Sequence, residues 1–210
     1  MFRHSSLACA LFAGLFAAAP ASAADSNGNF AVHGAGSQSC AQYITAVDGQ
    51  ADNQEVLIYV SWAQGYLSSL NRLQQNAFDV LPISGANDIA VLLARICRQN
   101  QEVPYANAVL RLARAFAPMQ IATDSPTIEL TRGDTTVRVR KAALAMVQQY
   151  LKDSGRYGGN VDGVFGERTA EAITEFQGEA EVPQTGLPDL NTFAAILARI
   201  VQAQQQQGNN

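Results

Sequence analysis

Histidine, which many hydrolytic sites need, is nearly absent from this sequence. The chain has two histidines, His4 and His33. Zinc hydrolases commonly bind their metal through several histidines, and Ser–His–Asp or Cys–His catalysis needs one beside the nucleophile. A glutamate-based site stays open, but Glu167 to Glu181 lie along one helical segment and are typical of a solvated face. We therefore expect a protein that is not an enzyme.

Positive charge is also scarce. The chain has 14 Lys and Arg against 18 Asp and Glu, and removing residues 1–23 takes away Arg3, so the balance becomes 13 against 18, or −5. Such a chain offers no broad basic face for nucleic acid or anionic lipid. We expect no nucleic-acid partner.

The chain lacks an apolar run long enough for a membrane span, which needs about 20 residues. The longest candidate, Leu7 to Ala19, follows Arg3 and His4 and precedes Pro20-Ala-Ser-Ala23. That order is typical of a secretory signal peptide. We expect residues 1–23 to be cleaved, residues 24–38 to form a flexible leader, and the protein to reside in the periplasm without a membrane span. An uncleaved N-terminal anchor is the alternative.

Cysteine is rare as well. Cys9 leaves with the signal peptide, and Cys40 and Cys97 remain. Two thiols in an oxidising compartment usually pair, and the closed loop is long enough for a stabilisation of about 4 kcal/mol. The sequence predicts a Cys40–Cys97 disulfide. Two buried free thiols are the alternative.

Apolar residues recur at helical spacing through residues 39–118. The expected elements are a short helix over Ser39–Val47, a long helix over Gln54–Ala77, a third capped by Ser84 or Asn87 that ends at Cys97, and a fourth with Pro104 at its first position. These helices indicate an N-terminal helical domain. The disulfide joins its first helix to the end of its third.

The pattern breaks at residues 119–136, which we interpret as a linker because prolines, threonines and Arg132-Gly-Asp134 gather there. Residues 127–130 and 135–139 are compatible with a small hairpin. Residues 137–200 carry three further amphipathic segments, and the Gln-rich tail 201–210 is expected to be disordered. The fold class is all-α, with two small helical domains.

The stretch Gly158–Gly166 is a glycine-rich loop with one Asp. An EF-hand loop needs an oxygen ligand where Gly158 falls and a bidentate Glu where Thr169 falls. A phosphate loop needs Gly-Lys-Ser/Thr, which does not follow. We therefore expect no metal and no cofactor. Asp162-Gly163 is strong turn chemistry, so the loop is predicted to be a rigid connector, with Val164 or Phe165 filling the core.

Residues 137–200 resemble the type 1 peptidoglycan-binding domain. The resemblance rests on Gln148-x-x-Leu151, Gly155-x-Tyr157, Val161-Asp-Gly-Val-Phe-Gly166, Thr169-x-x-Ala172, Phe176-Gln177, Thr185-Gly186 and Thr192. It implies a compact three-helix fold that binds peptidoglycan without catalysis. Val137 lies eleven residues before Gln148, which predicts a first helix about two turns longer than usual.

A sugar–peptide polymer suits aromatic side chains and hydrogen-bonding groups around one loop. The candidate peptidoglycan-binding residues are Tyr157, Asn160, Asp162, Phe165, Arg168 and Gln177. Phe165 is also compatible with the core, Asp162 with a turn scaffold, and Gln177 with bracing of the loop backbone. Tyr157 and Arg168 are the best candidates for an exposed surface.

Residues 34–118 more faintly resemble periplasmic acid-stress chaperones and the immunity proteins of type VI secretion. The resemblance rests on Gly34-Ala-Gly-Ser37, Cys40, Trp62-Ala-Gln-Gly-Tyr-Leu67, Asn71 and Cys97. It implies a small disulfide-tied helical bundle without enzymatic chemistry. The chaperone activity is not carried over, and a periplasmic protein that binds through residues 39–118 is a separate hypothesis. We therefore expect an exported, non-catalytic peptidoglycan-binding accessory protein. The alternatives are a protein-binding chaperone or immunity-type factor, or a regulatory partner of a separate wall hydrolase.

Overall fold

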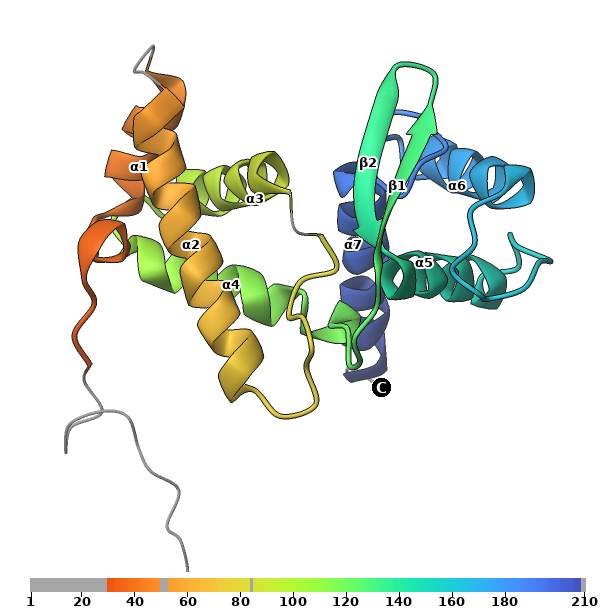
Figure 1. Ribbon diagram of the computed structural model, residues 1–210, viewed down its shortest axis with the longest axis horizontal. Helices are drawn as coiled ribbons and strands as arrows, with labels where there is room; N and C mark the ends of the chain where they lie inside the picture. The colour runs from red at the N-terminus through yellow and green to blue at the C-terminus, as the bar shows by residue number, and fades with distance from the viewer. Residues whose placement is uncertain (1–29, 50–52, 84, 209–210) are drawn as a thin grey trace, which may run out of the picture. The chain divides into compact units, whose positions relative to one another are not determined.

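Amphipathic helices build most of the chain (Figure 1). The structure is a computed structural model that describes residues 30–49, 53–83 and 85–208. The N-terminal helices are α1 (Cys40–Asp48), α2 (Asn53–Leu73), α3 (Ala86–Gln99) and α4 (Tyr105–Ala115), preceded by a 3-10 turn at Gly34–Ser37. The later elements are β1 (Thr127–Arg132), β2 (Thr135–Arg140), α5 (Lys141–Asp153), α6 (Glu167–Glu179) and α7 (Leu190–Gly208).

The start of α1 is fixed by a capping box and by a disulfide. The Ser39 hydroxyl accepts from the backbone N–H of Gln42, whose side chain accepts from the Ser39 N–H. Directly after this cap, Cys40 is bonded to Cys97 near the end of α3, with the Cα atoms 4.9 Å apart. The predicted disulfide is confirmed, and the free-thiol alternative is excluded.

Two helix starts differ by one or two residues from the expectation. Gly85 precedes α3, so Asn87 lies inside the helix, and Ser84 lies outside the described residues. Pro104 precedes α4 as its capping residue, with an extended ψ of 140°, and is not its first helical residue. A proline suits either position because the first backbone N–H groups of a helix have no intrahelical acceptor.

A cluster of three tyrosines fills the N-terminal core beside the disulfide. The rings of Tyr43, Tyr59 and Tyr105 lie 4.8–5.1 Å apart, and each hydroxyl donates to a carbonyl or amide oxygen. Burial raises the pKa of Tyr43 to about 12 and raises the pKa of Tyr105 further. These phenols therefore stay protonated and act as hydrogen-bond donors within the core.

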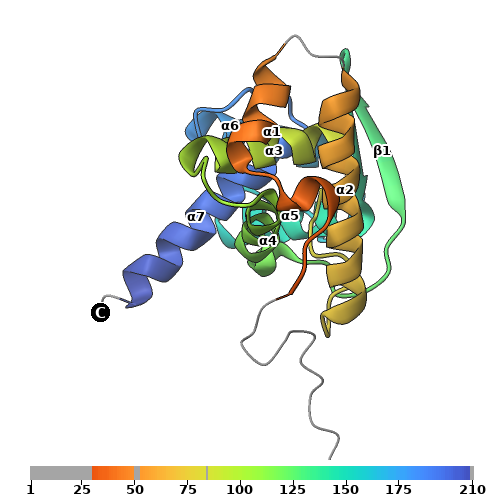
Figure 2. The same cartoon turned by 90° about the vertical axis from the view of Figure 1, so that its left-hand side faces the viewer.

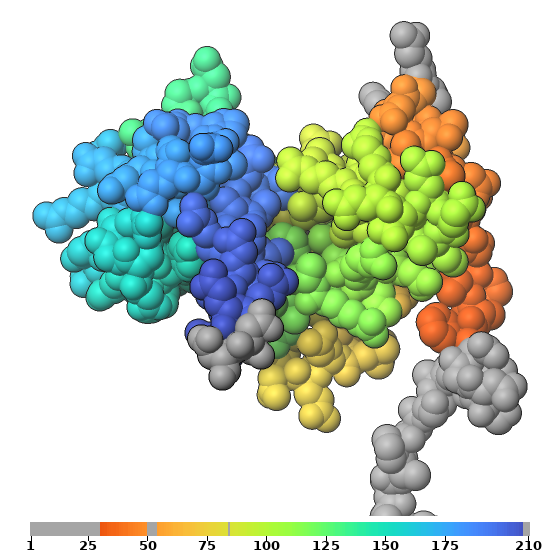
Figure 3. Space-filling view, turned by 180° about the vertical axis from the view of Figure 1, so that it is seen from behind, coloured from red at the N-terminus to blue at the C-terminus, as the bar shows by residue number. Residues whose placement is uncertain are grey.

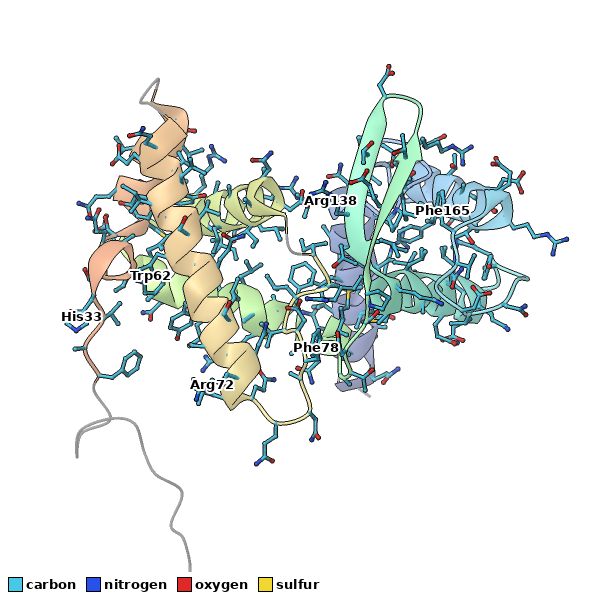
Figure 4. The ribbon with its side chains drawn as sticks, in the orientation of Figure 1. His33, Trp62, Arg72, Phe78, Arg138 and Phe165 are labelled. Atoms are coloured by element: carbon cyan, nitrogen blue, oxygen red, sulfur yellow. A yellow bond between two sulfur atoms is a disulfide. The ribbon has the colours of Figure 1, made fainter. Side chains whose placement is uncertain are left out.

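Trp62 and Tyr66 stack on one face of α2, with ring centroids 5.3 Å apart. The Trp62 indole donates to the His33 carbonyl at 2.8 Å, and a Cβ added to Gly36 would overlap the Trp62 ring. Figure 4 shows Trp62 on the side of α2 toward His33. The Gly34–Ser37 turn thus packs on the half-buried Trp62.

A β-hairpin separates the two groups of helices and corrects the all-α fold class. Strands β1 and β2 pair antiparallel around the turn Gly133-Asp134, with Thr127 opposite Arg140 and Arg132 opposite Thr135. The expected two-turn extension of the first C-terminal helix is wrong, because residues 135–140 form β2. Thr, Val and Arg alternate along that segment, and β-branched residues with a period of two favour a strand.

The segment expected to be a linker is packed against the N-terminal helices. Met119 and Ile121 are buried, and Ile121 pairs with Asp79 in an isolated bridge. Arg140 at the end of β2 donates through Nε to Asp79 at 3.0 Å and lies over the Phe78 ring. Residues from Val32 onward form one compact unit, so the division into two helical domains is not confirmed.

Helices α5, α6 and α7 bury apolar residues that belong to the same continuous core as those of the N-terminal helices. Leu144, Leu151, Ile173 and Phe193 are fully buried there. In Figure 3, α7 lies against α5 on one side and against the segment after α4 on the other.

Helix α7 continues to Gly208, where we expected a disordered tail, and its last turns project beyond the neighbouring helices (Figure 2). Residues 201–207 are exposed, and their Gln and Ala are good helix formers.

The apolar run Leu7–Ala19 and the expected signal peptide lie outside the described residues. Within residues 30–49, 53–83 and 85–208, no helix has the length and hydropathy to cross a membrane.

Candidate functional site

Gln148 holds the loop between α5 and α6 from inside the core. Its polar side chain lies on the apolar face of α5 and is fully buried. The amide oxygen accepts from the backbone N–H groups of Asp162 at 3.1 Å and Gly163 at 2.8 Å, and the amide nitrogen donates to the Val164 carbonyl at 2.9 Å. One buried side chain therefore satisfies three backbone groups of the loop, an arrangement that we call a glutamine clamp.

Gln177 does the same for the loop between α6 and α7. It is also fully buried, and its amide oxygen accepts from Gly186 N at 2.8 Å. Its amide nitrogen donates to the Leu187 carbonyl at 3.1 Å and to the Thr192 hydroxyl at 2.8 Å. Because both ends of the amide are used inside the core, Gln177 braces a loop and has no exposed atom for a ligand.

The two loops repeat one design. Gly163 and Gly186 both have φ of +66°, a conformation that favours glycine. The residue before each glycine, Asp162 or Thr185, accepts through its side-chain oxygen from the N–H two positions on, at 2.9 Å and 3.2 Å. This confirms Asp162-Gly163 as turn chemistry, with the Asp162 carboxylate acting as scaffold.

The apolar residues of the first loop divide between core and solvent. Phe165 packs against the core, whereas the Val164 side chain is 57% exposed. Figure 4 shows Phe165 beside α6. Phe165 therefore fills the core, and Asn160 remains exposed on the loop.

Tyr157 is mostly buried under the same loop. Its hydroxyl donates to the Asn160 carbonyl at 3.1 Å and lies 3.3 Å from the Thr169 hydroxyl. Tyr157 thus supports the loop with its polar end, and its ring borders an open depression beside α6. We expected the Tyr157 side chain to be exposed, but only the part of its ring that borders the depression is.

This depression is the candidate site, and we call it the α6 depression. It has a volume of about 320 Å³ and is lined by Arg156, Tyr157, Gly158, Arg168, Glu171, Ala172 and Glu175. Guanidinium groups bind carboxylates, and carboxylates accept from amines and hydroxyls. The site therefore offers both charges for a zwitterionic or polar ligand.

An ion pair fixes one wall of the α6 depression. Arg156 donates through Nε to both carboxylate oxygens of Glu179, at 3.0 and 3.1 Å, and a further contact joins its Nη2 to the same group. The hydrogen bond from Arg156 holds the pKa of the Glu179 carboxyl below its usual value, and the same pairing raises the pKa of Arg156. Arg156 is therefore held against the end of α6.

Of the six candidate residues, the α6 depression brings together Tyr157 and Arg168. Asn160, Asp162 and Phe165 lie elsewhere on the loop, and Gln177 lies in the other clamp. The sequence interpretation missed Arg156, Glu171 and Glu175 as site residues. The signal was present, because residues 168, 171, 172 and 175 follow helical spacing on one face of α6.

The site carries no arrangement for metal binding. Within the part of the chain that the structure describes, no group of three or more His, Cys, Asp or Glu side chains is placed to hold an ion.

Comparison with known protein families gives one match. Residues 140–196 match the peptidoglycan binding domain family. The match begins at the end of β2 and covers both glutamine clamps and the α6 depression. No curated protein and no solved structure matches the chain at a significant level.

The resemblance noted in the sequence is thereby confirmed for the three-helix unit. A peptidoglycan-binding domain supports binding of the protein to the cell wall. The buried glutamines, glycines and threonines of the motif maintain the loop geometry. Among the charged residues that line the α6 depression, Arg156 is held by Glu179, whereas Arg168, Glu171 and Glu175 lie along one face of α6.

Proposed function

We propose that this is an exported, non-catalytic accessory protein that binds peptidoglycan through the α6 depression. The observation that carries the proposal is the match of residues 140–196 to the peptidoglycan binding domain. The Cys40–Cys97 disulfide supports export, because disulfides persist in oxidising compartments such as the periplasm.

The chemistry of the α6 depression suits the peptide stems of peptidoglycan, which carry carboxylates and amines. Arg168 is exposed and makes no side-chain hydrogen bond or ion pair among the described residues, so its guanidinium is available to a ligand carboxylate. Glu171 and Glu175 lie on the same face and suit an amine or sugar hydroxyls. The ring edge of Tyr157 adds an apolar border.

The test is a pull-down of the purified mature protein with insoluble peptidoglycan sacculi over a range of salt concentrations. We expect wild-type protein in the pellet and Arg168→Ala to bind about tenfold more weakly, as loss of one charge-assisted hydrogen bond worth about 1.4 kcal/mol would give. Arg114→Ala on α4 is the matched control, since Arg114 is equally exposed but outside the depression.

Recovery of the wild-type protein entirely in the supernatant would overturn the wall-binding proposal. Equal binding by Arg168→Ala and Arg114→Ala would retain wall binding but move the site away from the α6 depression. Circular dichroism spectra of both variants establish that neither change alters the helical content.

A further inference from the structure

A second cavity, of about 530 Å³, opens beside the outer edge of β2. Its walls are residues 136–139 of β2, the residues around the start of α3, and residues 188–191 before and within α7. Ile83 and Val139 contribute buried apolar surface. Figure 4 shows Arg138 on the side of β2 that faces α3. We call this cavity the β2 groove.

The strand register identifies the backbone groups that face the β2 groove. The two-residue turn makes Arg132 and Thr135 the hydrogen-bonded closing pair. Hydrogen-bonded and non-hydrogen-bonded pairs alternate along an antiparallel ladder. Thr136 and Arg138 therefore point their N–H and C=O groups away from β1.

Two contacts support this register. The Thr131 and Thr136 hydroxyls lie 2.9 Å apart, as expected for the closer side chains of a non-hydrogen-bonded pair. The N–H of Lys141 donates to the Pro126 carbonyl at 2.8 Å, in the position where the next hydrogen-bonded pair falls. Among the described residues, no other backbone segment pairs with the outward groups of Thr136 and Arg138.

Two carboxylates line the same groove. Asp88 is half-buried in the first turn of α3, and Asp189 precedes α7, where it accepts from the Thr192 N–H at 2.9 Å. Burial, and then the nearby negative charge of Asp189, raise the pKa of Asp88. The Arg138 side chain pairs with Glu129 at 2.8 Å on the hairpin and does not neutralise them. The groove thus complements a cation.

We propose that the β2 groove binds an extended segment of a partner protein, which adds as a third strand to β2 and places a Lys or Arg side chain beside Asp88 and Asp189. The outward groups of Thr136 and Arg138 lie about 7 Å apart along the strand. A segment of three residues therefore spans them and satisfies all four backbone groups.

A polypeptide of L-residues fits this edge better than peptidoglycan does. Regular pairing needs an unbroken backbone with alternating side chains, whereas the stem peptides of peptidoglycan contain D-residues and a side-chain-linked peptide bond. The β2 groove is therefore a protein-binding surface, distinct from the α6 depression, and its role does not depend on wall binding.

The test is an NMR titration of the ¹⁵N-labelled mature protein. The probe is a pool of blocked five-residue L-peptides with a central lysine and β-branched flanking residues. We expect saturable shifts of the amide signals of residues 136–139. A matched pool with glutamine at the centre should bind about fivefold more weakly, as a partly buried charge pair implies, and a pool with proline at the centre should not bind.

Two variants, each with a matched control, test the strand pairing and the charge recognition separately. Arg138→Pro removes an outward N–H from β2, a change that sheet edges tolerate, and should weaken binding about tenfold or more by also disturbing the neighbouring bonds. Thr131→Pro makes the same change on the outer edge of β1 while keeping the Arg138–Glu129 ion pair, and should bind within about twofold of wild type. Asp88→Asn should weaken the lysine pool about fivefold and leave the glutamine pool unchanged, with the exposed Asp134→Asn as control.

Absence of a saturable shift at residues 136–139 with ~1 mM peptide would overturn the proposal, as would equal effects of Arg138→Pro and Thr131→Pro. Displacement of the peptides by soluble peptidoglycan fragments would also overturn it. Asp88→Asn should bind sacculi like wild type, so this result is independent of the pull-down that tests wall binding.

Discussion

Replacing Gln148 with leucine removes the clamp on the first loop while nearly preserving side-chain volume. It leaves the N–H groups of Asp162 and Gly163 without an acceptor and the Val164 carbonyl without a donor. The Gly163 N–H bond is buried, and an unsatisfied buried group costs about 1–3 kcal/mol. The other two groups are partly buried and regain some hydration, so we expect a total loss of about 2–4 kcal/mol.

Urea unfolding of the mature protein, followed by circular dichroism, measures this loss. Gln149→Leu is the matched control, because Gln149 is adjacent and exposed, and its one side-chain bond, to Asp153, lies at the surface. Surface changes of this kind stay within about 0.5 kcal/mol of wild type. A Gln148→Leu protein as stable as Gln149→Leu would refute the role of the buried glutamine.

Hydrogen exchange locates the effect within the chain. In Gln148→Leu the amides of residues 162–164 should exchange faster, because they lose their acceptor or their anchored geometry. The amides of α1 and α3 should lose at most the protection that corresponds to the global loss measured in urea, because their exchange is limited by global unfolding. Equal acceleration in both regions would show that Gln148 supports the whole chain and not the loop.

Three further predictions concern the disulfide, the Gly36 contact and the acid limb of stability. Reduction of the disulfide, or replacement of both Cys40 and Cys97 by serine, should lower the free energy of unfolding measured in urea by about 4 kcal/mol, because the bond closes a loop of 57 residues and so reduces the entropy of the unfolded chain. A loss below about 1 kcal/mol would contradict this. Gly36→Ala should cost about 1–3 kcal/mol by overpacking against the tryptophan ring, with a shift of tryptophan fluorescence, whereas alanine at the uncrowded Gly65 should leave the spectrum unchanged. Because Arg156 lowers the folded-state pKa of Glu179, the pair stabilises the fold above the ordinary carboxyl pKa of 4.5 and loses this effect as pH falls through the lower folded value. In Glu179→Gln the free energy of unfolding should therefore depend less steeply on pH below 4.5. An unchanged slope would exclude the linkage.

The helices of the C-terminal unit could be predicted because their apolar spacing and loop chemistry agree. The three segments beginning near Ala143, Thr169 and Leu190 each show a 3.6-residue period, and Asp162-Gly163 marks the turn between two of them. The N-terminal helices and the disulfide followed from the same periodicity and from the count of cysteines. In these regions local preference and tertiary packing favour the same structure.

The glutamine clamps show where sequence interpretation stops. A polar residue within an apolar stripe does not reveal whether it is buried, because its hydrogen-bond partners come from a distant loop. For this reason Gln177 was considered both as a ligand contact and as a brace of the loop backbone, and its hydrogen bonds to Gly186, Leu187 and Thr192 support the second interpretation. Whether such a residue is buried depends on the tertiary position of the loop that covers it.

The hairpin shows a different difficulty. The sequence was compatible with the hairpin that the structure shows over residues 127–132 and 135–140, but Val137 and Val139 also fit the start of a helix, and we counted them in the helical unit because the family resemblance begins nearby. The alternation of Thr136 and Arg138 with these valines carried the correct signal. A short two-stranded element gains its stability from what it packs against, here the buried Leu130 and Val139 over the C-terminal core.

The repeated loop design separates the residues that hold the fold from those that are available for binding. Gln148 precedes the glycine that it binds by 15 residues, whereas Gln177 precedes its glycine by 9. Helix α5 ends five residues after Gln148 and α6 ends two residues after Gln177, so three of the six additional residues are helical and three belong to the first loop. Since both clamps fix equivalent ends of their loops, these three additional loop residues are not required to close the turn. They lie in the span that contains Arg156, Tyr157 and Gly158, the part of the loop that lines the α6 depression. The second loop makes the same clamp without this excursion, and its Pro188 and Asp189 line the β2 groove instead. The two loops thus contribute to different surfaces, and the proposed contact with peptidoglycan is assigned to the longer loop and not to the clamp beneath it.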